Sequence, residues 1–208
     1  MPKRISVDGR NFAQAVAQAA EVLQAGGVIA YPTETVYGLG ALLGRPGAVA
    51  RIRALKGKTE PMPALVSGPK MAGQYVEMDE RAKRVMKKFW PGPLTIILKG
   101  KASVPAEALG AAQGLGVRMS SDRLAQALVE AVEEAITSTS ANRTGKEPLA
   151  DGLELERELG AELDLILDCG RRAGRASTVI DLSGKEPRLV REGPVKFKEI
   201  LEALQWQG

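Results

Sequence analysis

The sequence predicts an α/β protein that folds as a single domain around a twisted, mixed β-sheet flanked by helices. Helical patterns and short apolar strands alternate in the first half of the chain, and strands crowd the second half. The 208 residues show no linker-like change in composition and no internal repeat. Aromatic residues make up only 4% of the chain, so we expect a core of Leu, Val, Ile and Ala.

The first third of the chain alternates between helix and strand. Residues 11–25 repeat apolar side chains at intervals of three and four, which predicts an amphipathic helix ended by a Gly-Gly pair. Residues 28–31 (VIAY) are a short apolar run typical of a strand. Residues 47–55 form a second helical pattern, and residues 63–66 (PALV) form a second strand before a turn at SGPK.

The middle of the chain carries clear helix boundary signals. Residues 79–89 form a helical pattern with Asp79 as its N-cap and two lysines in its last turn, an arrangement that suits the helix dipole. The WPGP segment must end this helix. A strand at 94–98 follows, and residues 115–119 form another.

The last third combines two helices with several strands. A helix over 122–134 is expected to be capped by Ser121, and residues 135–142 open as a strand and end in a polar loop. Further strands and a closing helix are predicted over 163–168, 178–182, 188–191 and 195–204.

Composition excludes several kinds of chemistry. The chain has no histidine, so Ser-His-Asp and Cys-His catalysis and histidine metal ligands are impossible. Its single cysteine excludes a disulfide framework and a cysteine zinc site. We expect a cytoplasmic protein without membrane association, because no signal-peptide pattern or long apolar run is present. The net charge of +4 permits a polyanionic partner without requiring one.

Three polar loops each lie at the end of a predicted strand, where open α/β sheets place their ligands. The first, YPTETVYGLG at 31–40, offers threonine hydroxyls and two glycines that we expect to let the chain turn. The second, at 54–66, places Lys56 and Lys58 around a glycine, where they would suit phosphates or simply the end of a helix. The third, TSTSANRTG at 137–145, is either a turn or a polar ligand site.

Two arginines stand out from their surroundings. Arg118 lies on an otherwise apolar strand, where a charge needs a partner or a cavity, and it is a plausible clamp for a carboxylate. Arg191 ends another strand and could meet a phosphate. Glu34, the one acid of the first loop, has no evident role.

The ordered set of motifs YPTETVYGLG, LKGK, WPGPLT, VRM, TSTSAN, STVID and LVREGP resembles the YrdC/Sua5 family from about residue 10 to residue 204. The chain looks like the short, single-domain form over 1–208, without the C-terminal domain of longer Sua5 proteins. The resemblance implies a sheet curved around a large basic cavity. It also implies threonylcarbamoyl-AMP synthase activity, in which L-threonine, bicarbonate or CO2 and ATP give threonylcarbamoyl-AMP and pyrophosphate.

The resemblance also implies roles for individual residues. The catalytic residues would be Lys56 and Lys58. The threonine-binding residues would be Thr35, Arg118, Ser138 and Ser177. The ATP-binding residues would be Lys56, Lys58, Ser140, Asn142 and Arg191. Mg²⁺ would arrive with ATP, without a dedicated protein metal site.

The resemblance implies partners and leaves two alternatives open. A transferase complex would pass the threonylcarbamoyl group to an adenosine of tRNA (t6A modification), and direct contact with tRNA or double-stranded RNA is possible. The alternatives are a sister enzyme that handles another carbamoyl or acyl adenylate, and a double-stranded RNA-binding protein of the same fold. Three residues depart from the family pattern: Lys58 replaces an arginine, Ser67 a histidine and Ser120 a proline.

Overall fold

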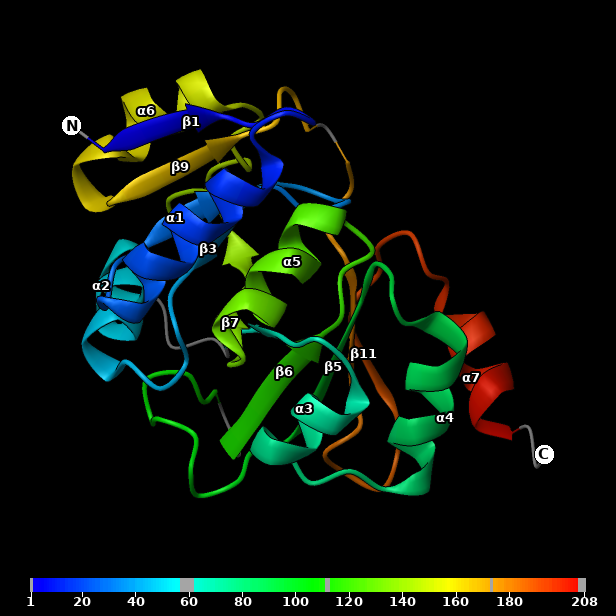
Figure 1. The fold of residues 1–208 in the computed structure, drawn as a ribbon. Helices are drawn as coiled ribbons and strands as arrows, with labels where there is room; N and C mark the ends of the chain where they lie inside the picture. The colour runs from blue at the N-terminus through cyan, green and yellow to red at the C-terminus, as the bar shows by residue number, and fades with distance from the viewer. Residues whose placement is uncertain (1, 57–61, 111–112, 173, 206–208) are drawn as a thin grey trace.

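The α/β class is confirmed, but the strands form two mixed sheets where the sequence predicted one (Figure 1). The computed structural model describes residues 2–56, 62–110, 113–172 and 174–205. Sheet A has the order β1 (Lys3–Ser6), β9 (Leu165–Asp168), β2 (Ile29–Tyr31), β3 (Gly38–Gly40) and β8 (Thr139–Ser140). Sheet B has the order β11 (Arg188–Arg191), β10 (Thr178–Asp181), β5 (Leu94–Lys99), β6 (Gly114–Arg118), β4 (Ala64–Leu65) and β7 (Ile136–Thr137).

One short segment belongs to both sheets. β7 pairs with β4 in sheet B through Thr137 and Ala64, and β8 pairs with β3 in sheet A through Thr139 and Leu39. Ser138 is the single residue between these two pairings. The chain therefore passes from one sheet to the other at Ser138, and the polar loop predicted at this point lies where the two sheets meet.

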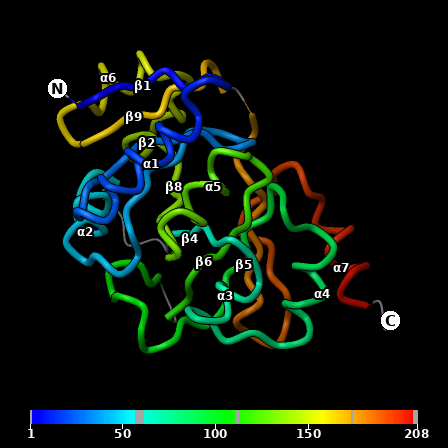
Figure 2. Tube along the Cα trace, in the orientation of Figure 1, coloured from blue at the N-terminus to red at the C-terminus, as the bar shows by residue number. Residues whose placement is uncertain are grey.

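Strand β9 of sheet A pairs with segments that are far apart in the sequence. β9 runs parallel to β1, with Lys3 opposite Leu165, and parallel to β2, with Ile29 opposite the same leucine. The Cα trace shows β1, from the first residues, beside β9 (Figure 2). β1 was not predicted from the sequence, because the segment KRIS is mostly polar; in the structure it is mostly exposed.

The helices cover the outer faces of the sheets. α1 (Phe12–Gln24) packs against α5 (Arg123–Val132), and α4 (Glu80–Phe89) packs against α7 (Phe197–Gln205) (Figure 1). These four helices and α2 (Pro46–Lys56) agree with the sequence prediction to within about two residues. Three helices were not predicted from the sequence: α3 (Pro69–Tyr75), α6 (Gly152–Leu159) and a short 3₁₀ helix at Gly160–Glu162.

Two helix N-caps test the boundary predictions. The Asp79 side chain accepts a hydrogen bond from the amide of Ala82, which confirms the predicted cap of α4. The predicted cap of α5, Ser121, is wrong. Asp122 caps this helix instead, because its carboxylate accepts from the amides of Leu124 and Ala125.

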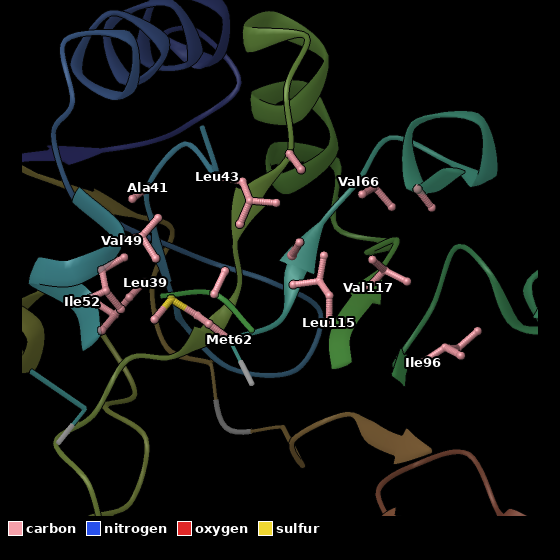
Figure 3. Packing of buried hydrophobic residues seen from close by; sticks show 14 of the residues in the cluster. Leu39, Ala41, Leu43, Val49, Ile52, Met62, Val66, Ile96, Leu115 and Val117 are labelled. Atoms are coloured by element: carbon pink, nitrogen blue, oxygen red, sulfur yellow. The ribbon is translucent and has the colours of Figure 1, made fainter. Parts of the chain in front are cut away.

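Alternate residues of sheet A face two different apolar clusters. Leu165 and Leu167 pack with α1 and α5, whereas Ile166 faces the larger cluster on the other side. That larger cluster is mainly aliphatic, as the composition predicted, although it includes Tyr37 and Trp90. Figure 3 shows part of it, where side chains of α2, the strands and the loops between them meet: Leu39, Leu43, Val49, Ile52, Met62 and Leu115.

The glycines of the first loop serve packing rather than turning, which corrects the expectation from the sequence. Gly38 and Gly40 lie in β3, opposite β2. A Cβ on Gly40 would lie 2.8 Å from Cε1 of Tyr31, and one on Gly38 would lie 3.3 Å from its Cζ. The buried Tyr31 ring therefore occupies the space that side chains at these positions would need. In the described part of the chain, no helix has the length and apolar character of a membrane span.

A candidate ligand cavity between the two sheets

A cavity of about 480 Å³ lies between the sheets. Sheet A contributes Gly38 of β3 and Ser140 of β8, and sheet B contributes one face of its central strands. Along β5 and β6 the lining residues alternate, as expected for one face of a sheet. These alternating residues are Thr95, Ile97, Gly116 and Arg118.

The predicted site residues that the structure describes all line this cavity. They come from six separate stretches of the chain, and the fold brings them together although the first and last of them, Thr35 and Arg191, are more than 150 residues apart. Lys58 lies outside the described residues, and Ser67 is not among the lining residues. The lining set includes Thr35, Lys56, Arg118, Ser138, Ser140, Asn142, Ser177 and Arg191.

Arg118 is a buried charge with specific partners. Its guanidinium is 6% exposed and lies 2.8 Å from the Glu34 carboxylate, which is 19% exposed. Nη2 of Arg118 also donates to Oγ1 of Thr35 at 3.1 Å, so the predicted carboxylate clamp is fixed by the loop that follows β2. The hydroxyl of Ser120 donates to the second carboxylate oxygen of Glu34.

The same partners keep Glu34 ionised. Burial alone would raise the pKa of the Glu34 carboxyl, but the positive charge of Arg118 and the hydrogen bonds from Ser120 and Arg118 outweigh it. The net result is a pKa below the ordinary value of 4.5. Glu34 therefore carries a negative charge at neutral pH, directly behind the cavity wall.

Lys56 joins the end of α2 to the loop after β8. Its ammonium donates to the backbone carbonyls of Ser140 and Asn142 at 3.0 and 3.1 Å and to Oδ1 of Asn142 at 2.6 Å. The Ser140 hydroxyl donates to the same Oδ1 at 2.6 Å. The Asn142 amide nitrogen donates to the carbonyls of Arg143 and Lys146. The lysine, serine and asparagine therefore form one connected group.

Arg191 is anchored by the residue that precedes β10. Its Nε and Nη2 donate to the Ser177 carbonyl at 3.1 and 2.9 Å. The Ser177 hydroxyl is 3.0 Å from Oγ1 of Thr95, a buried residue of β5. Ser177 was predicted to bind threonine and Arg191 to bind ATP. These hydrogen bonds therefore connect the two predicted halves of the site.

Sequence reasoning missed two residues of this site. Thr95 lines the cavity, and a polar side chain inside the apolar run LTIIL was the signal that could have found it. Ser120 carries no such signal, because its role as a donor to Glu34 appears only when two distant segments meet. A covalent role for the single cysteine has no support, since burial raises the pKa of the Cys169 thiol to about 11.

The cavity is rich in hydroxyls and cations. Its charged lining residues are Lys56, Arg118 and Arg191, and none of the described lining residues is acidic. Such a site suits a ligand with anionic groups, held by positioning and charge. The fold and the cavity together define an α/β protein with a cationic, hydroxyl-rich cavity between two sheets.

Comparison with known proteins identifies the family. A family model for Sua5, YciO and YrdC, described as "Telomere recombination", matches residues 21–193. The chain belongs to the Sua5/YciO/YrdC family, as its motifs predicted.

Curated relatives include both named and uncharacterised proteins. Threonylcarbamoyl-AMP synthase of Pyrococcus abyssi is 36% identical over 88% of this chain, and this chain spans only 55% of that protein. Threonylcarbamoyl-AMP synthase of Nitrosococcus oceani is 36% identical over 75% of this chain and 87% of its own length. The uncharacterised protein YciO of Escherichia coli is 35% identical over 88% of this chain and 91% of its own length.

Solved structures show the same two groups. A structure of P. abyssi Sua5 complexed with L-threonine has a TM-score of 0.87 at 32% identity and matches 99% of this chain, which covers 60% of the Sua5 chain. E. coli YciO has a TM-score of 0.87 at 33% identity, with 96% of this chain and 98% of the YciO chain covered.

Proposed function

We propose that this protein makes threonylcarbamoyl-AMP and pyrophosphate from L-threonine, bicarbonate or CO2, and ATP. The observation that carries the proposal is the gathering, around one cavity, of residues predicted for threonine and residues predicted for the nucleotide. Relatives named threonylcarbamoyl-AMP synthase and a Sua5 structure with L-threonine support it.

The proposed reaction needs positioning and charge rather than a protein nucleophile. The neutral threonine amine adds to CO2 through a new N–C bond and releases one proton to solvent. The oxygen of the resulting carbamate attacks the α-phosphorus of ATP. A new P–O bond forms to the carbamate, and the bond to pyrophosphate breaks with its electron pair on the leaving group. A chain without histidine can carry out this step, because it requires cations near the phosphates and an aligned carbamate.

Each half of the cavity has a proposed task. Arg118 would hold the threonine carboxylate, while Thr35, Ser138 and Ser177 would contact the amine and the side chain. The nucleotide would lie against the other half, where positive charge would offset the phosphates. The proposed nucleotide contacts are Lys56, Lys58, Ser140, Asn142 and Arg191. Mg²⁺ would accompany ATP, since the described residues hold no cluster of three acids or cysteines suited to a metal.

The proposed product is an activated intermediate that another enzyme consumes. A threonylcarbamoyl transferase complex would move the group to an adenosine of tRNA. Direct contact of this chain with tRNA or other double-stranded RNA would be electrostatic, given the net charge of +4. Such contact would weaken steeply with salt, which a binding titration at several salt concentrations would measure.

The direct test uses the purified protein with ATP, radiolabelled bicarbonate and L-threonine. We expect label in an adenylate, and pyrophosphate release that depends on both threonine and bicarbonate. An Arg118→Gln variant should lose threonine dependence, whereas Asp181→Asn, at an ion pair outside the cavity lining, should retain it. Pyrophosphate release unaffected by threonine would contradict the proposal.

A second candidate is a sister enzyme that handles another carbamoyl or acyl adenylate. The likeness to E. coli YciO favours it, because YciO matches this chain along nearly its whole length and at similar identity. Lys58 in place of the family's arginine also changes the grip on phosphate from a planar fork to a point charge. Replacing threonine by other amino acids and short carboxylic acids in the same assay separates the two candidates.

A further inference from the structure

Glu34 is the residue of the first loop that the proposed reaction leaves without a task. Its carboxylate lies 2.8 Å from Arg118, and both side chains are largely buried. Ser120 donates to the other carboxylate oxygen, and the same Ser120 hydroxyl accepts from the amide of Asp122 at 3.2 Å. Glu34 is therefore held in place by contacts on both of its oxygens.

The pair sets the electrostatic character of the cavity around Arg118. The positive charge of the guanidinium is balanced there by the negative charge of Glu34, 2.8 Å away. Asp122 is similarly paired, with Arg172 at 3.4 Å. The region around Arg118 is therefore locally neutral.

We propose that Glu34 makes the Arg118 region selective for a zwitterionic α-amino acid over a carboxylate that lacks an ammonium group. This inference rests on the proposed function and deepens it. A bound carboxylate gains from Arg118 but is repelled by Glu34. An amino acid brings its own positive charge, which Glu34 attracts. Charges that lie a few ångströms apart interact strongly at the low effective dielectric of a protein interior. The charge that a ligand brings close to Arg118 and Glu34 therefore affects its affinity.

The hydroxyl groups beside Arg118 support an ammonium at this place. The Thr33 hydroxyl donates its single proton to the carbonyl of Val36 at 2.7 Å. The Thr33 hydroxyl therefore has no proton left for Thr35, whose own hydroxyl lies 2.9 Å away. Oγ1 of Thr35 accepts from Arg118 with one of its two lone pairs. Thr35 therefore keeps a second lone pair that can accept from an N–H group in the cavity.

The charge state of Glu34 agrees with this arrangement. Its pKa lies below the ordinary value, despite burial, because of the positive charge of Arg118 and the hydrogen bonds it receives. The carboxylate is therefore ionised throughout the neutral range. A protonated Glu34 would leave Arg118 as an unbalanced cation and would favour any carboxylate.

The test compares matched ligands by calorimetric titration in the absence of ATP. One ligand is L-threonine, and the other is the corresponding α-hydroxy acid, in which a hydroxyl replaces the ammonium. We expect the wild type to prefer L-threonine by about tenfold or more. Glu34→Gln should reduce this preference by about tenfold or more, with tighter binding of the hydroxy acid.

Asp181→Asn is the matched control. Asp181 also pairs with an arginine, Arg188, and accepts from a serine hydroxyl, that of Ser183, but neither Asp181 nor Arg188 lines the cavity. The control should keep the wild-type ratio of affinities. An unchanged ratio in Glu34→Gln would overturn the inference. Equal binding of the two ligands by the wild type would also overturn it, and that measurement needs no variant.

A second ligand pair separates the inference from the proposed function. L-alanine and lactate differ by the same exchange of ammonium for hydroxyl. If the wild type prefers alanine over lactate by about tenfold but binds threonine no better than alanine, the charge selectivity is supported and threonine as substrate is contradicted. If threonine binds well but its hydroxy acid binds equally well, the substrate is supported and the charge selectivity is overturned.

Discussion

Nζ of Lys56 lies 2.6 Å from Oδ1 of Asn142, and the same ammonium contacts two backbone carbonyls of the loop after β8. A lysine has three protons to donate, so these contacts can occupy all of them. Lys56 thereby holds the Ser140–Asn142 segment against the end of α2. Its proposed action on phosphates would require ATP to replace or share these contacts.

Lys56→Ala tests both consequences of this geometry. We expect pyrophosphate release to fall about 100-fold or more, because a cation and the order of the loop are lost together. Amide hydrogen exchange should accelerate at Leu149, whose amide donates to Ala141 in the same loop. Lys101→Ala removes another lysine that donates to a backbone carbonyl, that of Gly73, and should change neither readout. Full activity in Lys56→Ala would contradict the catalytic assignment.

Gly40→Ala tests the packing of Tyr31 on β3. The added methyl group would lie 2.8 Å from Cε1 and 3.1 Å from Cδ1 of the buried ring, so the ring or the strand must move. We expect a loss of about 1–3 kcal/mol in the free energy of unfolding, measured by chemical denaturation. Gly47→Ala, in α2, meets nothing within 4 Å and should be neutral or slightly stabilising. Equal stability of the two variants would argue against the described packing.

Glu34 should give the protein a defined dependence of stability on pH. Its folded-state pKa lies below 4.5, so the unfolded state binds the proton more readily. The stabilisation by Glu34 is therefore complete above the pKa that its carboxyl has in the unfolded state. It is lost as the pH falls through the pKa of the folded state. Denaturation curves between about pH 6 and pH 3 should show a steeper loss for the wild type than for Glu34→Gln. Parallel losses in the two proteins would contradict the lowered pKa.

Chelation of divalent ions should separate activity from stability. We expect EDTA to abolish threonine-dependent pyrophosphate release and Mg²⁺ to restore it, because the metal is proposed to arrive with ATP. The melting temperature of the ligand-free protein should not change, since the described residues hold no metal-ligating cluster. A fall in melting temperature on chelation would instead indicate a resident metal.

Much of this architecture could be predicted from local patterns. Amphipathic repeats located α1 and α5, and the acidic and basic ends of α4 located its boundaries. Arg118 was found because a charge on an apolar strand demands a partner or a cavity. Motif order supplied the remaining site residues, and the described ones all lie around the cavity, although their roles stay predictions.

The remaining features depend on distant contacts that no local pattern reports. The division into two sheets arises at Ser138, where a short polar segment changes partners. β1 becomes a strand because it pairs with β9, although three of its four residues are polar. The role of Gly40 follows from the Tyr31 ring on the neighbouring strand, and the partner of Glu34 lies more than 80 residues away.

The pairing of β1 with β9 has a consequence for biosynthesis. The β1–β9–β2 part of sheet A cannot form until the ribosome has made and released the segment around Leu165, some 160 residues after Lys3. Contacts of such high sequence separation are slow to form, because a long loop must close before they stabilise the fold. During that interval the apolar faces of α1 and β2 lack their partner strand, so the nascent chain should depend on chaperones more than one built from local contacts.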